Sequence, residues 1–115
     1  MLTLKFGGTS MGSARRILDS VEIMIGRAKS DRISVVVSAV AGISNKLQTA
    51  IDGCASGGTA ESFVSELRRI HVDICAEIKS ELPEFSTESV NAKIEPLFSE
   101  LEKLLAGLTV FGECP

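Results

Sequence analysis

The sequence has no tryptophan and no tyrosine, and it has only one histidine. Proteins that bind nucleic acids typically stack bases on aromatic side chains and attract phosphates with a basic surface. The 115 residues include 12 basic and 15 acidic ones, which gives a net charge of -3 and no basic surface. We therefore expect no nucleic-acid partner.

Long apolar runs and paired cysteines are also missing. No stretch of about 18 apolar residues is available to span a bilayer, so we expect no membrane insertion. Cys54, Cys75 and Cys114 lie far apart and outside any CxxC spacing, which predicts neither a zinc site nor a disulfide framework. The first residues lack the features of a secretory signal peptide. These absences favour a reducing, cytoplasmic location.

The composition that remains is that of a folded chain with at most one domain. Apolar residues make up 44% and charged residues 23%, which is too apolar for intrinsic disorder. Residues 1 to 60 carry seven basic and four acidic groups, and the remainder carries five and eleven. This split predicts a first half that can handle anions and a solvated, acidic second half.

The first 37 residues have the pattern of a strand, a helix and a second strand. Leu2 to Phe6 is a short apolar run that ends at Gly7-Gly8. Ser13 is a suitable N-cap, and apolar residues then recur at helical spacing over 14 to 29. Ile33 to Val37 is β-branched and apolar, which is typical of a parallel strand covered on both faces.

Helices are predicted for the rest of the chain. One follows Asn45 and ends at Gly57-Gly58, and residues 59 to 108 carry two apolar stripes typical of an antiparallel hairpin joined at residues 82–86. Pro96 predicts either a kink or the first turn of a separate helix. Gly107 predicts the end of the last helix, and Leu108 to Phe111 fits a third strand or a final helical turn equally well.

The predicted fold class is α/β: the start of a parallel three-layer α/β/α sandwich, followed by an antiparallel helical hairpin. We expect residues 1-58 to hold the ligand-binding loops and residues 59-108 to form the hairpin. Two strands leave a sheet incomplete, with an open edge and an uncovered apolar face. The 115 residues therefore have the character of an incomplete domain.

Lys5 is the most informative residue, because a lysine inside an apolar strand is costly to bury without an anionic partner. Gly7 and Gly8 permit unusual backbone angles and a close ligand approach, Thr9 and Ser10 add hydroxyl groups, and the following helix offers free N–H groups. Together they predict a site for a nucleotide's phosphates. The alternative is an edge-strand lysine that reaches water beside an ordinary glycine turn.

Two other phosphate-binding motifs do not fit this loop. A P-loop places its lysine after the glycines, whereas Lys5 precedes them. A dinucleotide fingerprint requires a glycine where Thr9 stands, and the second strand is followed by Ser38 and not by an acid.

A second loop, Ser38 to Asn45, follows the second strand. Ligands of open α/β sheets bind at the carboxyl ends of strands, so both loops should face a common crevice. Ser38 and Ser44 offer hydroxyl groups, and Gly42 permits a close backbone approach. The alternative for Ser44 and Asn45 is a plain helix cap.

Lys5-Phe6-Gly7-Gly8-Thr9-Ser10 and Ser38-Ala39-Val40-Ala41-Gly42-Ile43-Ser44-Asn45 closely resemble the N-terminal signatures of aspartate kinases, in the amino-acid kinase family. The resemblance implies ATP, Mg²⁺ held through the nucleotide, and L-aspartate, with 4-phospho-L-aspartate as the product and lysine, threonine and methionine biosynthesis as the pathway. It also implies a homo-oligomeric full-length protein.

The resemblance also implies roles for individual residues. Lys5 would be catalytic and stabilise the transferring phosphoryl group. Gly7, Gly8, Thr9 and Ser10 would hold the ATP phosphates. The residues beside aspartate would be Ser38, Gly42 and Ser44, and Ser44 stands where the family usually has threonine. No metal ligand is implied in this stretch.

The family's kinase domain is considerably longer than this chain, so we expect these residues alone to be catalytically silent. The alternatives are a related kinase acting on glutamate, carbamate or a nucleoside monophosphate, and a helical protein-interaction module. His71 is interpreted as a boundary residue of the hairpin, and Cys54 and Cys75 as core residues. Glu113 receives no role.

Overall fold

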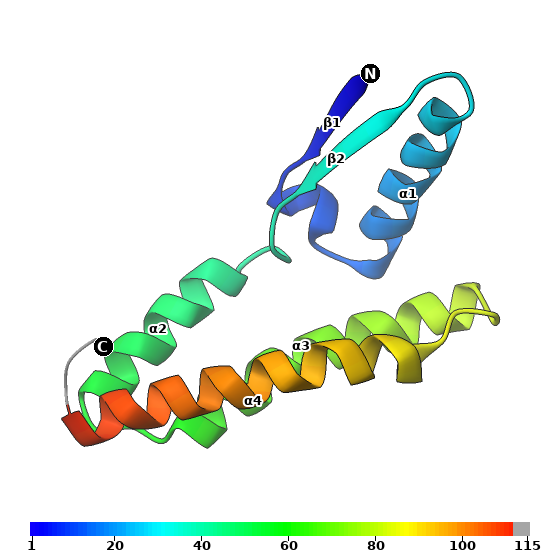
Figure 1. Ribbon diagram of the computed structural model, residues 1–115. Coiled ribbons are helices and arrows are strands. Elements are labelled where there is room, and N and C mark those ends of the chain that lie inside the picture. Colours follow the sequence, from blue (N-terminus) through cyan, green and yellow to red (C-terminus); the bar gives the residue numbers. More distant parts are fainter. Residues whose placement is uncertain (112–115) are drawn as a thin grey trace. The chain divides into compact units, whose positions relative to one another are not determined.

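A computed structural model describes residues 1–111 and is mixed α/β, as the sequence predicts (Figure 1). The chain forms two compact units, Met1–Ser44 and Asn45–Pro115. The first unit holds the two strands, and the second holds the two long helices. The division into residues 1-58, which would hold the ligand-binding loops, and residues 59-108, which would form the hairpin, stays a prediction.

The first unit is built on two parallel strands. Strand β1 (Leu2–Phe6) pairs with β2 (Ile33–Val37), with Leu2 opposite Ile33 and Phe6 opposite Val37. Helix α1 (Ala14–Ala28) connects them and lies alongside the sheet (Figure 1). The predicted N-cap is confirmed, because the Ser13 hydroxyl accepts a hydrogen bond from the Arg16 N–H at 3.3 Å.

The sheet is apolar but only partly covered. Side chains alternate along β1, with Leu2, Leu4 and Phe6 half-buried and the residues between them exposed. Strand β2 remains exposed over its last three valines, and Val36 keeps 48% of its surface accessible. The expectation that β2 is covered on both faces is therefore wrong for the described residues. The predicted uncovered apolar face is confirmed.

The predicted antiparallel hairpin is confirmed in the second unit. Helix α3 (Ala60–Glu81) and helix α4 (Thr87–Phe111) lie side by side and are joined by residues 82–86 (Figure 1). Helix α2 (Ile43–Ala55) precedes them. The buried apolar residues of the hairpin are Ala60, Val64, Leu67, Cys75, Ile78, Phe98, Leu105 and Leu108.

Helix α4 continues through both residues that were expected to interrupt it. Pro96 lies inside this single helix, so the prediction of a separate helix starting there is wrong. Gly107 does not end it, and Leu108 to Phe111 forms its last turn. A proline costs about 3 kcal/mol and a glycine about 1 kcal/mol in a helix interior. Phe98, Leu105 and Leu108 of this helix are buried, and their burial offsets both penalties.

The junction between α2 and α3 is a glycine turn, as predicted. Gly57 adopts a φ of +94°, which favours glycine. The ring of Phe63 packs onto Gly53, and the Thr109 hydroxyl donates a hydrogen bond to the Gly58 carbonyl at 2.8 Å. Cys54 and Cys75 are buried, as predicted, whereas Cys114 lies outside the described residues. Within residues 1–111, no helix combines the length and apolar character that a membrane crossing requires.

Candidate functional site

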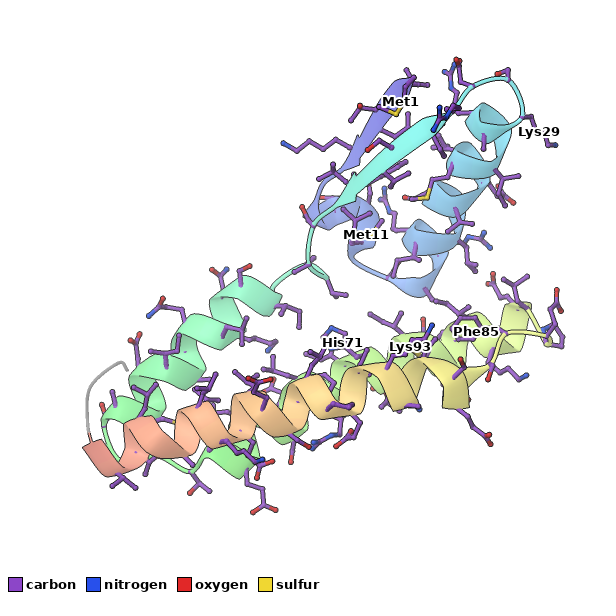
Figure 2. All side chains as sticks on the ribbon, in the orientation of Figure 1. Met1, Met11, Lys29, His71, Phe85 and Lys93 are labelled. Atoms are coloured by element: carbon purple, nitrogen blue, oxygen red, sulfur yellow. The ribbon has the colours of Figure 1, made fainter. Side chains whose placement is uncertain are left out.

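The candidate site consists of the two loops that follow β1 and β2. Sequence analysis places the next helix at residues 14 to 29, with Ser13 as its N-cap, and predicts no element between that helix and the glycine turn. Instead, Gly8–Met11 forms a short 3₁₀ helix, η1, and Gly12 and Ser13 separate it from α1. Figure 2 shows Met11 and Lys29 labelled near opposite ends of α1.

The two loops lie against each other. A β-carbon built on Gly8 would stand 4.0 Å from both the Ala39 carbonyl oxygen and the Ala41 Cα. A β-carbon on Gly12 would stand 3.4 Å from the Ala41 Cβ and 3.2 Å from the Thr9 carbonyl oxygen. A side chain at position 12 would therefore crowd both neighbours. Sequence analysis considered the glycines only as a possible dinucleotide-binding motif. The four-residue spacing between Gly8 and Gly12 could have indicated that the turn needs small residues at both positions.

Ser20 connects helix α1 to the 3₁₀ turn, and sequence analysis missed it. Ser20 is almost fully buried, with 3% of its surface exposed. The Ser20 hydroxyl lies 2.9 Å from the Arg16 carbonyl and 3.4 Å from the Ser10 carbonyl, and it is the donor to both. Met11 is buried in the same turn. These two side chains hold η1 in place. The sequence has no periodic pattern from which their burial could be predicted.

Lys5 is exposed on β1, opposite Val36 on β2. Adjacent strand partners share a face of the sheet, so Lys5 lies on the face where Val36 is also exposed. The argument that Lys5 is desolvated in its strand is therefore wrong. Its ammonium group is instead accessible to an anion that approaches the end of the sheet.

The backbone angles of Gly7 and Gly8 are ordinary. Gly7 has a φ of -78°, and the glycines with positive φ among the described residues are Gly42 and Gly57. The expectation of unusual angles at Gly7 and Gly8 is therefore wrong. A β-carbon on Gly7 would meet nothing within 4 Å, so open space surrounds the backbone there. Thr9 is exposed and Ser10 half-buried in η1.

The second loop begins where the parallel ladder ends. The Ser38 N–H donates a hydrogen bond to the Phe6 carbonyl at 3.0 Å, which fixes the loop's first residue beside the glycine loop. Gly42 has a φ of +84° and precedes α2 directly. Ser44 and Asn45 lie inside the first turn of α2, so their interpretation as a cap before the helix is wrong. Ser38, Gly42 and Ser44 are all exposed.

His71 lies on α3, at the edge of the hairpin core. Its Nδ1–H donates a hydrogen bond to the Leu67 carbonyl at 2.8 Å, and its ring meets Phe98 edge-on at 5.5 Å. This half-buried position fits the predicted boundary residue. Within residues 1–111, no group of three or more histidine, cysteine or acidic side chains is arranged to hold a metal ion. Glu113 lies outside the described residues.

These features define a partial α/β domain with two adjacent loops at the carboxyl end of a parallel sheet. No protein-family model matches the chain. Over all 115 residues the chain is 28% identical to the bifunctional aspartokinase/homoserine dehydrogenase of Buchnera aphidicola subsp. Acyrthosiphon pisum (strain APS). The chain spans 14% of that protein's length. It is thus distantly related to an aspartokinase-containing enzyme.

Proposed function

We propose that this chain is the front part of the kinase domain of an ATP-dependent aspartate kinase. The reaction is transfer of the γ-phosphoryl group to the β-carboxylate of L-aspartate, which yields 4-phospho-L-aspartate and ADP. The packing of Gly8 and Gly12 against Ala39 and Ala41 carries the proposal, because it brings the two sequence motifs to one edge of the sheet. The relationship to the bifunctional enzyme supports the same activity.

The chemistry requires positioning and positive charge more than proton transfer. A β-carboxylate is already ionised at neutral pH and attacks phosphorus without a general base. The exposed ammonium of Lys5 would stabilise charge on the transferring group. The open backbone at Gly7 and the start of η1 would hold the phosphates, with Thr9 and Ser10 beside them. Ser38, Gly42 and Ser44 would line the place for aspartate.

Mg²⁺ would neutralise charge on the phosphates when bound with the nucleotide. The two loops, residues 7 to 12 and 38 to 45, contain no carboxylate, so in this proposal the nucleotide carries the ion. The residues of the first unit would act on the phosphates directly.

Aspartate-dependent release of ADP tests this function. The assay uses the longest polypeptide that carries residues 1–115, with glutamate, carbamate and a nucleoside monophosphate offered as alternative acceptors. Turnover with aspartate alone supports the proposal, whereas turnover with another acceptor assigns a related kinase. We expect the 115-residue chain to show no turnover by itself.

The second candidate is a helical protein-interaction module. The exposed leucines of α4 favour it, because they leave one face of the hairpin without a partner among the described residues. Isothermal titration of the 115-residue chain with ATP and Mg²⁺ separates the two candidates. A pure interaction module releases no heat, and a phosphate-binding loop does.

A further inference from the structure

The turn that would hold the phosphates is rich in glycine. Residues 7 to 12 include Gly7, Gly8 and Gly12, and a β-carbon on Gly7 would meet nothing within 4 Å. Glycine loses more conformational freedom than any other residue when its backbone becomes ordered. A ligand that needs this turn in one conformation therefore binds more tightly when other contacts have already fixed the turn.

Two buried side chains fix the turn. Met11, labelled in Figure 2, belongs to the turn and is buried. Ser20 lies on α1 and is almost fully buried, and its hydroxyl donates a hydrogen bond to the Ser10 carbonyl at 3.4 Å. Ten positions separate Ser10 from Ser20, so this bond links two elements of the first unit.

The bond to Ser10 is additional to the one that a helical serine ordinarily makes. A serine inside a helix commonly donates to the carbonyl four residues before it, and Ser20 does so to Arg16 at 2.9 Å. That bond alone satisfies the hydroxyl. The Ser10 carbonyl is a second acceptor for the same hydroxyl and lies outside the helix. Ser20 therefore contacts the turn as well as its own helix.

The same bond determines where the Ser10 carbonyl points. A carbonyl oxygen carries a partial negative charge and repels a phosphate, whereas backbone N–H groups attract one. Because the Ser10 carbonyl oxygen lies 3.4 Å from a buried hydroxyl on α1, it is directed towards that helix. It is therefore kept away from an anion that binds at the open side of the turn, around Gly7.

We propose that Ser20 is a positioning residue for the nucleotide: its hydroxyl holds residues 7 to 12 in the conformation that binds the phosphates of ATP. The inference rests on the phosphate-binding role proposed for this turn. It assigns Ser20 no contact with the ligand, because the residue is almost fully buried. The second loop is fixed separately by the Ser38 N–H, 3.0 Å from the Phe6 carbonyl, so aspartate binding should not depend on Ser20.

Ser20→Ala tests the proposal through the affinity for phosphates. Isothermal titration of the full 115-residue chain measures the Kd of ATP with Mg²⁺ and the Kd of inorganic triphosphate. Ser20→Ala should raise both values about threefold to tenfold, since the loss of one hydrogen bond corresponds to such a factor. A loss of affinity for ATP that is absent for triphosphate overturns the proposal.

The matched control is Ser13→Ala, which is the same chemical change in the cap of the same helix. It removes the hydroxyl that accepts a hydrogen bond from the Arg16 N–H at 3.3 Å. Both variants should destabilise α1 to a similar extent, but Ser13→Ala should leave both Kd values within about twofold of wild type. If Ser13→Ala weakens ATP binding as much as Ser20→Ala does, the effect is one of helix stability and the proposal is wrong.

Ser20→Thr separates the hydroxyl from the packing of the side chain. It keeps the donor and should bind ATP more tightly than Ser20→Ala. Equal affinity of the two variants would assign the loss to packing and overturn the proposal. Circular dichroism of every variant verifies that α1 remains intact.

Steady-state kinetics of the longest polypeptide that carries these residues separate this inference from the proposed function. Ser20→Ala should raise the KM for ATP about threefold to tenfold, and leave kcat and the KM for aspartate within about twofold. A wild-type polypeptide that binds ATP without phosphorylating aspartate refutes the kinase function, and the comparison of ATP affinities still decides the role of Ser20. A wild-type chain that binds neither ATP nor triphosphate, or a Ser20→Ala chain that binds both as wild type does, overturns this inference.

Discussion

The hydroxyl of Ser20 on α1 donates a hydrogen bond to the carbonyl of Ser10, 3.4 Å away in the 3₁₀ turn that follows Gly7. Ser20 is therefore the side chain that joins the helix to the glycine loop. Ser20 is almost fully buried and Ser10 is half-buried, so removal of this hydroxyl deprives the Ser10 carbonyl of its side-chain donor.

Ser20→Ala should lower the free energy of unfolding by about 1 kcal/mol, the typical cost of an unpaired buried group. It should also speed hydrogen exchange at the Gly12 N–H, whose 3.2 Å bond to the Thr9 carbonyl closes the turn. Denaturant unfolding and amide exchange measure the two effects. Ser30→Ala, at an exposed serine, is the control and should change stability by less than about 0.5 kcal/mol. Equal stability of the two variants would contradict the role of Ser20.

Lys5→Met should strongly slow phosphoryl transfer without affecting folding. Lys5 is exposed, so its removal leaves no cavity. Loss of a charge that stabilises the transferring group should reduce kcat by about 10²-fold or more. The measurement is aspartate-dependent ADP release by the longest polypeptide that carries these residues, alongside its thermal unfolding. Lys29→Met, in the turn after α1, is the matched control, and kcat near wild type for K5M would refute the assigned role.

Gly53→Ala and Gly107→Ala should change stability in opposite directions, although both lie inside helices. A β-carbon on Gly53 would lie 2.9 Å from Phe63 Cε2, so the ring must move, and we expect a loss of about 1–3 kcal/mol. A β-carbon on Gly107 would meet nothing within 4 Å, so alanine should stabilise α4 by about 0.5–1 kcal/mol. Denaturant unfolding gives both values. Stabilisation by G53A would show that Phe63 does not pack there.

Glu66 should titrate below the usual range of a glutamate. The hydrogen bond from Lys46, at 2.8 Å, and then the charge of Lys46 lower the pKa of this exposed carboxyl. Since the folded-state pKa is depressed, the pair's contribution to stability is complete above the unfolded-state pKa of about 4.3. It is lost as the pH falls through the folded-state pKa.

Lys46→Met should return the Glu66 pKa to its usual range, and an NMR titration of the Glu66 carboxyl measures the change. Lys93→Met removes a lysine that has no contact with Glu66 among the described ion pairs, and it should leave the titration unchanged. A Glu66 pKa that is the same with and without Lys46 would show that the pair does not form in solution.

Apolar periodicity predicted the strands, the hairpin and the start of α1, because burial of one face imposes a period of two or 3.6 residues. It could not predict η1, since four residues of mixed character take their shape from the burial of Met11 and the hydrogen bond of Ser20. The predicted start of α2, after Asn45, was also wrong, because the small polar residues between Ser38 and Asn45 carry no periodic signal.

Local propensity failed where packing opposed it. Pro96 and Gly107 disfavour a helix by themselves, but Phe98 and Leu108, close to them in the same helix, are buried. The exposure of Lys5 agrees with the alternative of an edge-strand lysine that reaches water, but the sequence could not decide between the two interpretations, because an apolar strand does not reveal which of its faces a neighbour covers. The adjacency of the two loops was predictable, since parallel strands end at one edge.

The hydrogen bond from Thr109 to Gly58 joins residues that are 51 positions apart. This bond connects the last turn of α4 to the glycine turn that precedes α3, and so links the two ends of the hairpin. The end of α4 therefore cannot fray independently of that turn, because opening one releases the other. A contact of such long sequence separation requires the two helices to have come together first, so we expect it to form late in folding.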